Sequence, residues 1–531
     1  MNKPATATTP TTESELPPAL TLLPDDQVRR LLGGVRASGG TIDTLAPATG
    51  QPLIALPQSS TDDVLAAFVA ARQAQRSWAA TPPAKRVKPF LRLADLLLSR
   101  QDEGLDLLQQ QTGKARLHAF EEIIDATTST LYYARKAPQL LKPARRAGAL
   151  PGFTRTYEYA HPKGVVATIT PWNYPLALAM DIIPALLAGN AIVHKPDNQT
   201  ALSSLWPREL LIEAGLPPEL WQVVLGDPAQ IGDTLIDNAD FVGFTGSTNA
   251  GRAIGQHAAQ RLIGCSLELG GKNPMIVLGD ADLDKTVRTA VRACFANAGQ
   301  LCVSIERIYV DANIFDDFVA RFAAAVKALR LGFALDYSTD MGSLNSERQL
   351  TRVTDHVQGA IASGAKVVTG GRPRPDLGPF FFEPTILVEV TPEAPLCREE
   401  TFGPVVSVYP FQFEAEAISL ANETKYGLNA AVFSRDTRHA REIASSIKAG
   451  TVNINEGYAS AYSSQSAPMG GMKASGVGRR HGPGGLLKYT DAQTIASQHI
   501  IGFDPVAGMD SQRHAQLLTR LLKSVKTLHI R

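Results

Sequence analysis

The chain has 531 residues, of which 44% are hydrophobic and 19% charged, and its formal net charge is +1. This length supports two to four domains with ample core, and the balanced charge argues against an electrostatic binder of nucleic acid. No run of about 18 apolar residues occurs, so no transmembrane segment is predicted. The four cysteines, Cys265, Cys294, Cys302 and Cys397, lack metal-site spacing. They predict a reduced, cytoplasmic setting without a metal.

The first 35 residues are rich in Thr and Pro and lack the apolar stretch of a signal peptide, so we interpret them as a disordered arm. Between residues 62 and 100 the apolar side chains recur at helical spacing, which predicts two amphipathic helices. Residues 140–162 contain a Pro- and Gly-containing stretch and then the alternating run FTRTYEYAH. That pattern predicts an exposed hairpin.

Residues 161–202 predict a strand, a helix and a second strand, because VVATI and AIVHK are apolar runs rich in β-branched residues. A second such unit follows, with a helix around 203–213, the strand WQVVL, a helix near 231, the strand DFVGFTG and a helix from 251. Alternating strands and helices predict a parallel sheet that binds ligands beyond the carboxyl ends of its strands. We assign residues 36–139 and 163–270 to this domain.

After residue 270 the strands NPMIVL, RIYV, AKVVTG and TVNIN predict a separate α/β domain over residues 271–480. The short strand TIASQHI, at 494–500, lies in a segment, 490–502, that we group with 140–162. Residues 508–531 predict an amphipathic helix with basic flanks. Such a helix docks on its own protein, covers a tunnel or lies on an anionic membrane. Its apolar stripe consists of Leu517, Leu518, Leu521, Leu522 and Val525.

Two reactive side chains lie in glycine-containing segments. Glu268 belongs to SLELGGKNP, where a buried acid needs a function or a partner. Cys302 ends NAGQLC, which surrounds its sulfur with small residues, whereas Cys294 in RACF has the setting of a core residue. A thiolate that attacks a carbonyl needs a second group to activate the water that releases the adduct. We therefore predict that Cys302 is a nucleophile and Glu268 the base.

Together with PWN, HKPDN, FTGSTNAG and EETFGPV, these segments resemble the aldehyde dehydrogenase superfamily over roughly residues 41–498. The resemblance implies an α/β fold with a Rossmann-like cofactor domain (36–139 and 163–270) and an α/β catalytic domain (271–480). It also implies a small oligomerisation sheet from 140–162 and 490–502. The expected protein is a homodimer or homotetramer that oxidises a small-molecule aldehyde with NADP or NAD.

In the mechanism that the resemblance implies, Cys302 attacks the aldehyde while the Asn173 side-chain amide and the Cys302 backbone N–H stabilise the oxyanion. Hydride transfer leaves a thioester, and Glu268 activates the water that hydrolyses it. Glu268 argues against the branch of the superfamily that forms acyl-coenzyme A. On local sequence alone, Asn173 could equally be a turn residue.

The resemblance also implies a set of cofactor contacts. Gly246 and Ser247 contact the pyrophosphate at a helix start, Lys195 bonds the adenosine ribose, and Glu400 bonds the nicotinamide ribose. A helix-capping turn would explain Gly246 and Ser247 as easily. The complete set is Thr170, Trp172, Asn173, Lys195, Asn198, Gly226, Gly246, Ser247, Gly251, Leu269, Glu400 and Phe402.

Asn198 predicts the cofactor preference. NAD-preferring members usually carry Glu three residues after the lysine that corresponds to Lys195, and this chain has Asn198. A carboxylate would repel a 2′-phosphate, whereas a neutral amide beside Lys195 tolerates it. We therefore predict that NADP is accepted and preferred. At Gly226 the sequence departs from the family pattern, because LGDP stands where relatives often have G-x-G.

Within the superfamily the chain looks most like succinate-semialdehyde dehydrogenases, whose substrate carboxylate calls for an arginine. Asp181 and Ala296 occupy the regions where such enzymes place arginines. Arg292 and Arg307 flank the cysteine segment and are the remaining candidates, but the pattern favours a solvated surface charge for either. Arg480 stands where relatives commonly have Glu. Alternatives are a dehydrogenase of medium-chain, long-chain or aromatic aldehydes and a catalytically silent binding protein.

Overall fold

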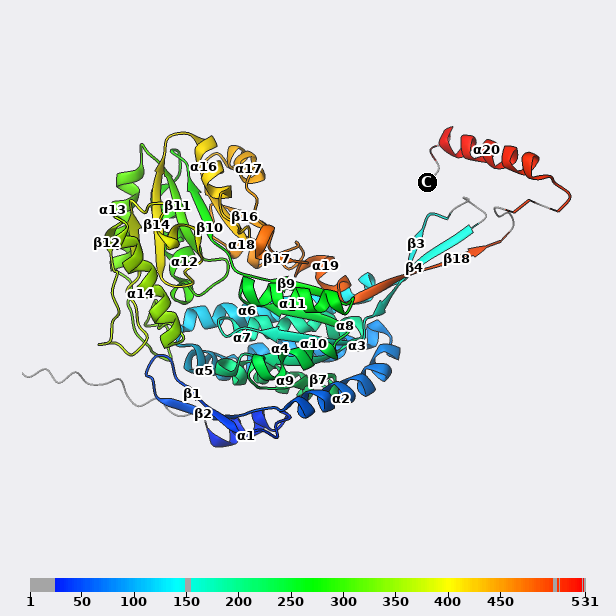
Figure 1. The fold of residues 1–531 in the computed structure, drawn as a ribbon, viewed down its shortest axis with the longest axis horizontal. Helices are drawn as coiled ribbons and strands as arrows, with labels where there is room; N and C mark the ends of the chain where they lie inside the picture. The colour runs from blue at the N-terminus through cyan, green and yellow to red at the C-terminus, as the bar shows by residue number, and fades with distance from the viewer. Residues whose placement is uncertain (1–23, 149–153, 500–503, 506, 528, 530–531) are drawn as a thin grey trace, which may run out of the picture.

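The computed structural model describes residues 24–148, 154–499, 504–505, 507–527 and 529. It consists of two α/β bodies, each with its own sheet, and an arm that projects from them (Figure 1). The two expected α/β units are confirmed as two largely parallel sheets. Among the described residues no helix is both long and apolar enough to cross a membrane.

The first body contains a six-stranded sheet in the order β17-β9-β8-β5-β6-β7. Its strands are β5 (Val165–Thr170), β6 (Ala191–Pro196), β7 (Trp221–Val223), β8 (Phe241–Thr245), β9 (Gly264–Glu268) and β17 (Gly476–Val477). All neighbours are parallel except β17, which runs antiparallel to β9. β17 comes from the segment assigned to the second domain, so the predicted boundary at 270 does not separate the two sheets completely.

Helices surround this sheet. They are α2 (Thr61–Ala80), α3 (Pro83–Arg86), α4 (Lys88–Ser99), α5 (Gln101–Thr112), α6 (Arg116–Leu140), α7 (Pro175–Ala179), α8 (Ile183–Ala188), α9 (Ala201–Glu213), α10 (Pro228–Asp237) and α11 (Thr248–Gln260). Ser60 and Asp63 form a reciprocal cap at the start of α2, which satisfies backbone N–H groups there. The helix expected from residue 251 begins three residues earlier.

Two short elements precede these helices. The hairpin of β1 (Thr41–Leu45) and β2 (Pro52–Pro57) was not predicted. Helix α1 (Asp25–Leu32) corrects the expectation of a disordered arm that extends to residue 35. Its Leu31 is buried in the core of the first body, and its Arg30 forms an ion pair with Glu209 of α9. These tertiary contacts stabilise a segment whose own sequence carries little helical signal.

The second body contains a seven-stranded sheet in the order β12-β13-β14-β11-β10-β15-β16. Its strands are β10 (Asn273–Val277), β11 (Ile305–Asp311), β12 (Lys366–Thr369), β13 (Thr385–Val388), β14 (Val405–Phe411), β15 (Asn429–Phe433) and β16 (Thr451–Ile454). The four predicted strands are confirmed as β10, β11, β12 and β16. The larger helices here are α12 (Leu283–Phe295), α13 (Phe315–Lys327), α14 (Glu347–Ala362), α16 (Glu414–Asn422) and α17 (Thr437–Ser445), and the short ones are α15 (Pro395–Arg398), α18 (Ala459–Tyr462) and α19 (Gly482–Leu487).

The arm is a three-stranded antiparallel sheet of β3 (Ala144–Arg146), β4 (Thr154–Pro162) and β18 (Thr490–Gln498). β18 starts four residues before the strand expected at 494–500, and the arm confirms an exposed strand pair within 140–162. The predicted C-terminal helix is confirmed as α20 (Ser511–Thr527). It lies beyond the arm and apart from both bodies of its own chain (Figure 1).

Candidate active site

Glu268 and Cys302 lie where the two bodies meet. Glu268 is the last residue of β9, and its backbone is held between β8 and Gly476 of β17. Cys302 follows the 3-10 helix Ala296–Gly299, in the loop that leads to β11. The Asn273 side chain, at the start of β10, donates to the Cys302 carbonyl at 2.8 Å. The start of β10 therefore fixes the loop that carries Cys302, the predicted nucleophile.

The loop before Cys302 is conformationally constrained. Asn297 and Ala298 have φ angles of 50° and 52°, which lie in the left-handed region that side chains rarely adopt. Such strain persists only where surrounding contacts determine the backbone, and it concentrates at functional sites. Buried apolar side chains supply those contacts on both sides of the cysteine. They include Leu301 and Val303.

Asn173 is oriented toward this loop. Its Nδ2 donates to the Gln300 carbonyl at 3.0 Å, which uses one of its two N–H groups. The backbone carbonyl of Asn173 accepts from Lys114 Nζ at 2.7 Å and from Asn297 Nδ2 at 3.1 Å. Lys114 is fully buried and paired with Glu122 at 2.5 Å. The sequence analysis missed this pair, which fixes the backbone that presents the Asn173 amide.

Burial has the largest effect on the pKa values of Glu268 and Cys302, the predicted catalytic pair. It raises the pKa of Glu268 to about 7, and Lys488 and then Arg480 act in the opposite direction. Oε1 of Glu268 is buried and has no hydrogen-bond partner among the described residues. Burial likewise raises the pKa of Cys302 to about 12, and Arg480 is the main group that opposes this. The resting thiol is therefore protonated at neutral pH, so the predicted nucleophilic role of Cys302 would require prior loss of the thiol proton.

Glu400 lies close to Cys302 and to the backbone that follows Glu268. Its Oε1 accepts from the Gly271 N–H at 2.8 Å, and burial raises its pKa to about 7. The next aromatic residue, Phe402, packs edge-on against Trp172 with ring centres 5.6 Å apart. Trp172, which was predicted beside the pyrophosphate, therefore lies next to Phe402, which was predicted near the nicotinamide ribose.

A buried ion pair holds the backbone that follows Glu400. Lys272 and Glu306 are joined at 2.6 Å, and both side chains are almost fully buried. Glu306 also accepts from the backbone N–H groups of Thr401 and Phe402 at 2.9 Å each. Sequence reasoning did not select this pair, because a lone lysine and a lone glutamate give no signal of being partners 34 residues apart.

The residues predicted to contact the pyrophosphate gather at the carboxyl end of the six-stranded sheet. Gly246 follows β8, and a side chain at that position would fall 2.5 Å from the Phe244 ring, so only glycine fits. Ser247 caps α11 by accepting from the Ala250 N–H at 3.3 Å. Gly251 lies in the first turn of α11 and lets Leu269 approach, since its Cβ would meet Leu269 at 2.4 Å.

Four further predicted cofactor residues lie at or just beyond the ends of β5, β6 and β7. Thr170 ends β5 and hydrogen-bonds His194 at 2.8 Å. Lys195 is 6% exposed, and in the part of the chain that the structure describes it donates no hydrogen bond. Asn198 Oδ1 accepts from the Gly226 N–H at 3.2 Å, which joins those two predicted residues. A largely buried lysine whose ammonium group donates no hydrogen bond to the described residues suits a phosphorylated ribose.

The arginines considered for a substrate carboxylate differ in their surroundings. Arg307 is 2% exposed and donates from Nε and Nη2 to the Lys272 carbonyl at 3.0 and 2.8 Å, so its interpretation as a surface charge was wrong. Arg292 is partly exposed and pairs with Glu456 at 2.5 Å. Its guanidinium lies 5.2 Å from the ring centre of Tyr458, which belongs to the apolar cluster around Cys302.

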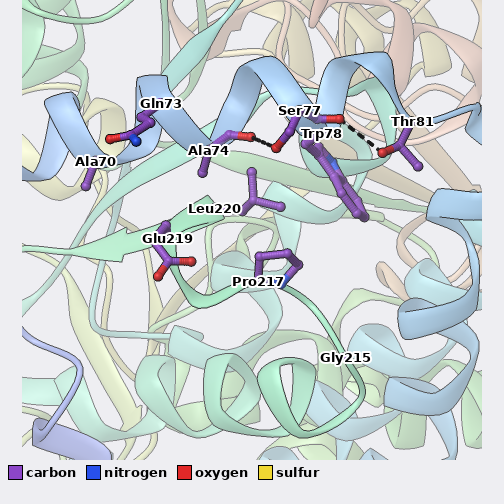
Figure 2. A pocket seen from close by; sticks show the side chains of 10 residues that line it. All are labelled: Ala70, Gln73, Ala74, Ser77, Trp78, Thr81, Gly215, Pro217, Glu219 and Leu220. Atoms are coloured by element: carbon purple, nitrogen blue, oxygen red, sulfur yellow. Dashed lines mark hydrogen bonds between the residues drawn. The ribbon is translucent and has the colours of Figure 1, made fainter.

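A groove of about 750 Å³ lies elsewhere, between α2 and the loop of residues 215–220 (Figure 2). Trp78 and Leu220 supply its apolar surface, and Glu219 and Gln73 its polar surface. None of the predicted catalytic or cofactor residues lines it. The groove is therefore separate from the Cys302 site.

Comparisons with known proteins agree with this arrangement. The aldehyde dehydrogenase family model matches residues 35–495. A Mycolicibacterium smegmatis protein named "putative succinate-semialdehyde dehydrogenase, NADP(+)" is 51% identical over 481 residues, which cover 90% of this chain and 93% of that protein. The succinate-semialdehyde dehydrogenase (NADP(+)) GabD of Escherichia coli is 36% identical, covering 86% of this chain and 94% of its own.

Solved structures give the same result. The betaine aldehyde dehydrogenase of Staphylococcus aureus, in complex with NAD+, superposes with a TM-score of 0.84 at 34% identity. That match covers 90% of this chain and 97% of the other. An NADP-dependent enzyme from E. coli also reaches a TM-score of 0.84, at 35% identity, over 87% of this chain and 96% of its own. The chain belongs to the aldehyde dehydrogenase family.

Proposed function

We propose that this aldehyde dehydrogenase oxidises succinate semialdehyde to succinate with NADP, through a thioester on Cys302. The observation that carries the chemistry is the convergence of Cys302, Glu268 and Asn173 at the junction of the two sheets. The names of the relatives at 51% and 36% identity support the substrate.

The protein's own groups divide the reaction into separate tasks. The Cys302 thiol loses its proton to solvent, and the resulting thiolate forms a bond to the aldehyde carbon. The free N–H of the Asn173 amide and the Cys302 backbone N–H stabilise the oxyanion. The chemistry that a bound nicotinamide supplies is acceptance of a hydride. Glu268, whose pKa is raised to about 7 by burial, takes a proton from the water that hydrolyses the thioester.

The residues around the carboxyl ends of β5, β6 and β8 suit a dinucleotide. Helix α11 starts at Thr248, two residues after Gly246, and the unpaired backbone N–H groups of a helix start suit a pyrophosphate. Lys195 would pair with a 2′-phosphate, and the neutral Asn198 adds no repulsion. Glu400, anchored on Gly271, would bond the nicotinamide ribose.

The residues near Cys302 that could contact the rest of the substrate are compatible with two classes of aldehyde. Arg292 borders the apolar cluster through Tyr458 and is the partly exposed cation available for a distal carboxylate. The cluster itself is apolar, with Tyr174, Leu178 and Met469 packed near Cys302. That lining favours, as a second candidate, a medium-chain or aromatic aldehyde.

A substrate panel tests the proposed function. With NADP, kcat/KM for succinate semialdehyde should exceed the values for hexanal and benzaldehyde at least about tenfold, which corresponds to about 1.4 kcal/mol of differential binding. NADP should exceed NAD by a similar factor. Higher values for hexanal or benzaldehyde would support the second candidate. Higher values with NAD would refute the cofactor proposal.

The variant Asn198→Glu is the matched control for cofactor choice. Its carboxylate would stand beside the 2′-phosphate and repel it, so we expect NADP efficiency to fall at least about tenfold while NAD efficiency is kept or improved. An equal loss with both cofactors would indicate damage to the site instead.

We also propose a cytoplasmic homodimer or homotetramer assembled through the arm. The four cysteines are free, which suits a reducing compartment. β18 is exposed along nearly its whole length, and its Ile495 pairs in register with Tyr157 of β4 on a sheet that projects into solvent. A three-stranded sheet with so little burial needs a partner surface to be stable.

Replacing Ile495 with Asp tests the assembly. A charge in the middle of this apolar patch should weaken association at least about tenfold and shift the protein toward monomers in sedimentation velocity. Thr494→Asp, which places the same charge on the opposite face of β18, should have a smaller effect. An Ile495→Asp variant that keeps the wild-type oligomer would exclude this face.

A further inference from the structure

Arg480 is a buried cation beside the catalytic pair. Its side chain is 7% exposed, and its Nη2 donates to Asp181 Oδ1 at 2.8 Å and lies 3.6 Å from Asp125 Oδ2. Its guanidinium also lies 5.9 Å from the ring centre of Tyr462, which packs against the apolar cluster with Cys302. Arg480 and Asp125 are buried, and Asp181 is 21% exposed. Burying charged groups is costly, so such a cluster is weak evidence of stabilisation and invites a functional explanation.

The backbone connects Arg480 directly to Glu268. The N–H and carbonyl of Arg480 exchange two hydrogen bonds of 2.8 Å with Met469, on the segment that continues into Gly470. Gly470 lies against the Glu268 carboxylate, because a side chain there would fall 3.1 Å from Oε1. Met469 itself packs in the cluster that contains Cys302. Through Met469, Arg480 thus holds in place the Met469–Gly470 segment that packs against the Glu268 carboxylate.

We propose that Arg480 is a positioning residue for the catalytic pair: held by Asp181 and Asp125, it supports the segment behind Glu268 and supplies positive charge to Glu268 and Cys302. This inference rests on the proposed roles of those two residues. It assigns a task to the position where the sequence departs from the Glu that relatives commonly carry.

The electrostatic surroundings support this role. Burial raises the pKa of Cys302, and Arg480 is the strongest group that lowers it. Burial also raises the pKa of Glu268, Lys488 and Arg480 lower it, and Asp181 raises it further. The titratable or charged groups that surround Arg480 and Glu268 are Asp125, Tyr133, Asp181, Cys302, Tyr462, Arg479, His481, Lys488 and Tyr489.

A substrate carboxylate is a less suitable partner for Arg480. Asp181 and Asp125 already occupy one side of its guanidinium, whereas Arg292 pairs with Glu456 alone and is more exposed. A third carboxylate at Arg480 would meet the repulsion of the two that are present. A positioning role for Arg480 should affect an aldehyde with a carboxylate and one without it equally. A role in binding the substrate carboxylate should affect only the first.

The experiment measures the pH dependence of thioester hydrolysis in single turnovers of the full-length enzyme, with succinate semialdehyde and with hexanal. Arg480→Met should raise the midpoint of the pH profile by about one unit with both aldehydes, which slows hydrolysis about tenfold below neutral pH. Arg480→Lys keeps the charge and should restore much of the rate. Arg321→Gln, in an exposed ion pair with Asp284, should change nothing.

Asp181→Asn should shift the midpoint of the pH profile in the opposite direction from Arg480→Met. Removing this negative charge while Arg480 remains should lower the midpoint, and it keeps the proposal testable if Arg480→Met does not fold. Circular dichroism and NADP binding establish that each variant is folded. Unchanged midpoints in folded variants would overturn the proposal. An increase of KM confined to succinate semialdehyde would overturn it too, by making Arg480 the substrate anchor.

These outcomes are distinct from a failure of the proposed chemistry. If wild-type enzyme formed no thioester, or if Cys302→Ala remained active, the roles of the pair themselves would be wrong whatever Arg480 does. A normal thioester and unmoved pH midpoints would reject the role of Arg480 alone.

Discussion

Replacing Cys302 with Ala should abolish aldehyde oxidation while the fold and the binding of NADP are retained. The sulfur forms the only covalent bond between enzyme and substrate in the proposed reaction, so its loss should lower kcat by on the order of 10⁴-fold or more. Alanine is smaller than cysteine and leaves the Asn273 bond to the backbone carbonyl intact. The measurement is formation of reduced cofactor in the steady state, together with NADP binding by calorimetry.

Cys294→Ala is the matched control. Cys294 is 1% exposed, belongs to α12 and packs in the core of the second body, away from the predicted catalytic side chains. Its variant should be slightly less stable because of a small cavity and should keep its activity. Substantial turnover by Cys302→Ala, or equal losses in the two variants, would contradict a nucleophilic role for Cys302.

The elements that the sequence predicted are those with strong local signals. VVATI and AIVHK became β5 and β6 because β-branched apolar runs flanked by glycine and proline fit a strand that is buried on both faces. The predicted site residues share one reason for their convergence. Most follow a strand or begin a helix, and the carboxyl ends of parallel strands meet at one edge of a sheet.

The features that escaped prediction depend on contacts distant in sequence. Lys114 and Glu122 read as ordinary charges, yet both are fully buried and position Asn173. β17 is only two residues long, and its pairing with Glu268 comes from a segment more than 200 residues away. Arg480 was recognised as unusual, but its partner Asp181 lies 299 positions earlier. No periodicity or propensity carries such information.

Replacing Glu268 with Gln should separate the two halves of the reaction. Attack and hydride transfer depend mainly on Cys302 and the oxyanion donors, whereas release of the acid requires a base for water. We therefore expect a burst of reduced cofactor equivalent to one per active site, followed by a steady rate about 10²- to 10⁴-fold below that of wild type. Stopped-flow absorbance measures the burst, and mass spectrometry of the quenched enzyme measures the acyl group on Cys302.

The pH dependence of wild-type hydrolysis provides the second half of this test. Burial raises the pKa of Glu268 to about 7, and only its deprotonated form accepts a proton from water. The hydrolysis rate should therefore rise as pH increases through about 7 and level off above it, and Glu268→Gln should lack this step. Glu268→Asp keeps a carboxylate on a shorter side chain and should retain the pH step at a reduced rate. A variant without a burst but with normal thioester breakdown would move Glu268 to the first half of the reaction, as the base that activates the protonated thiol.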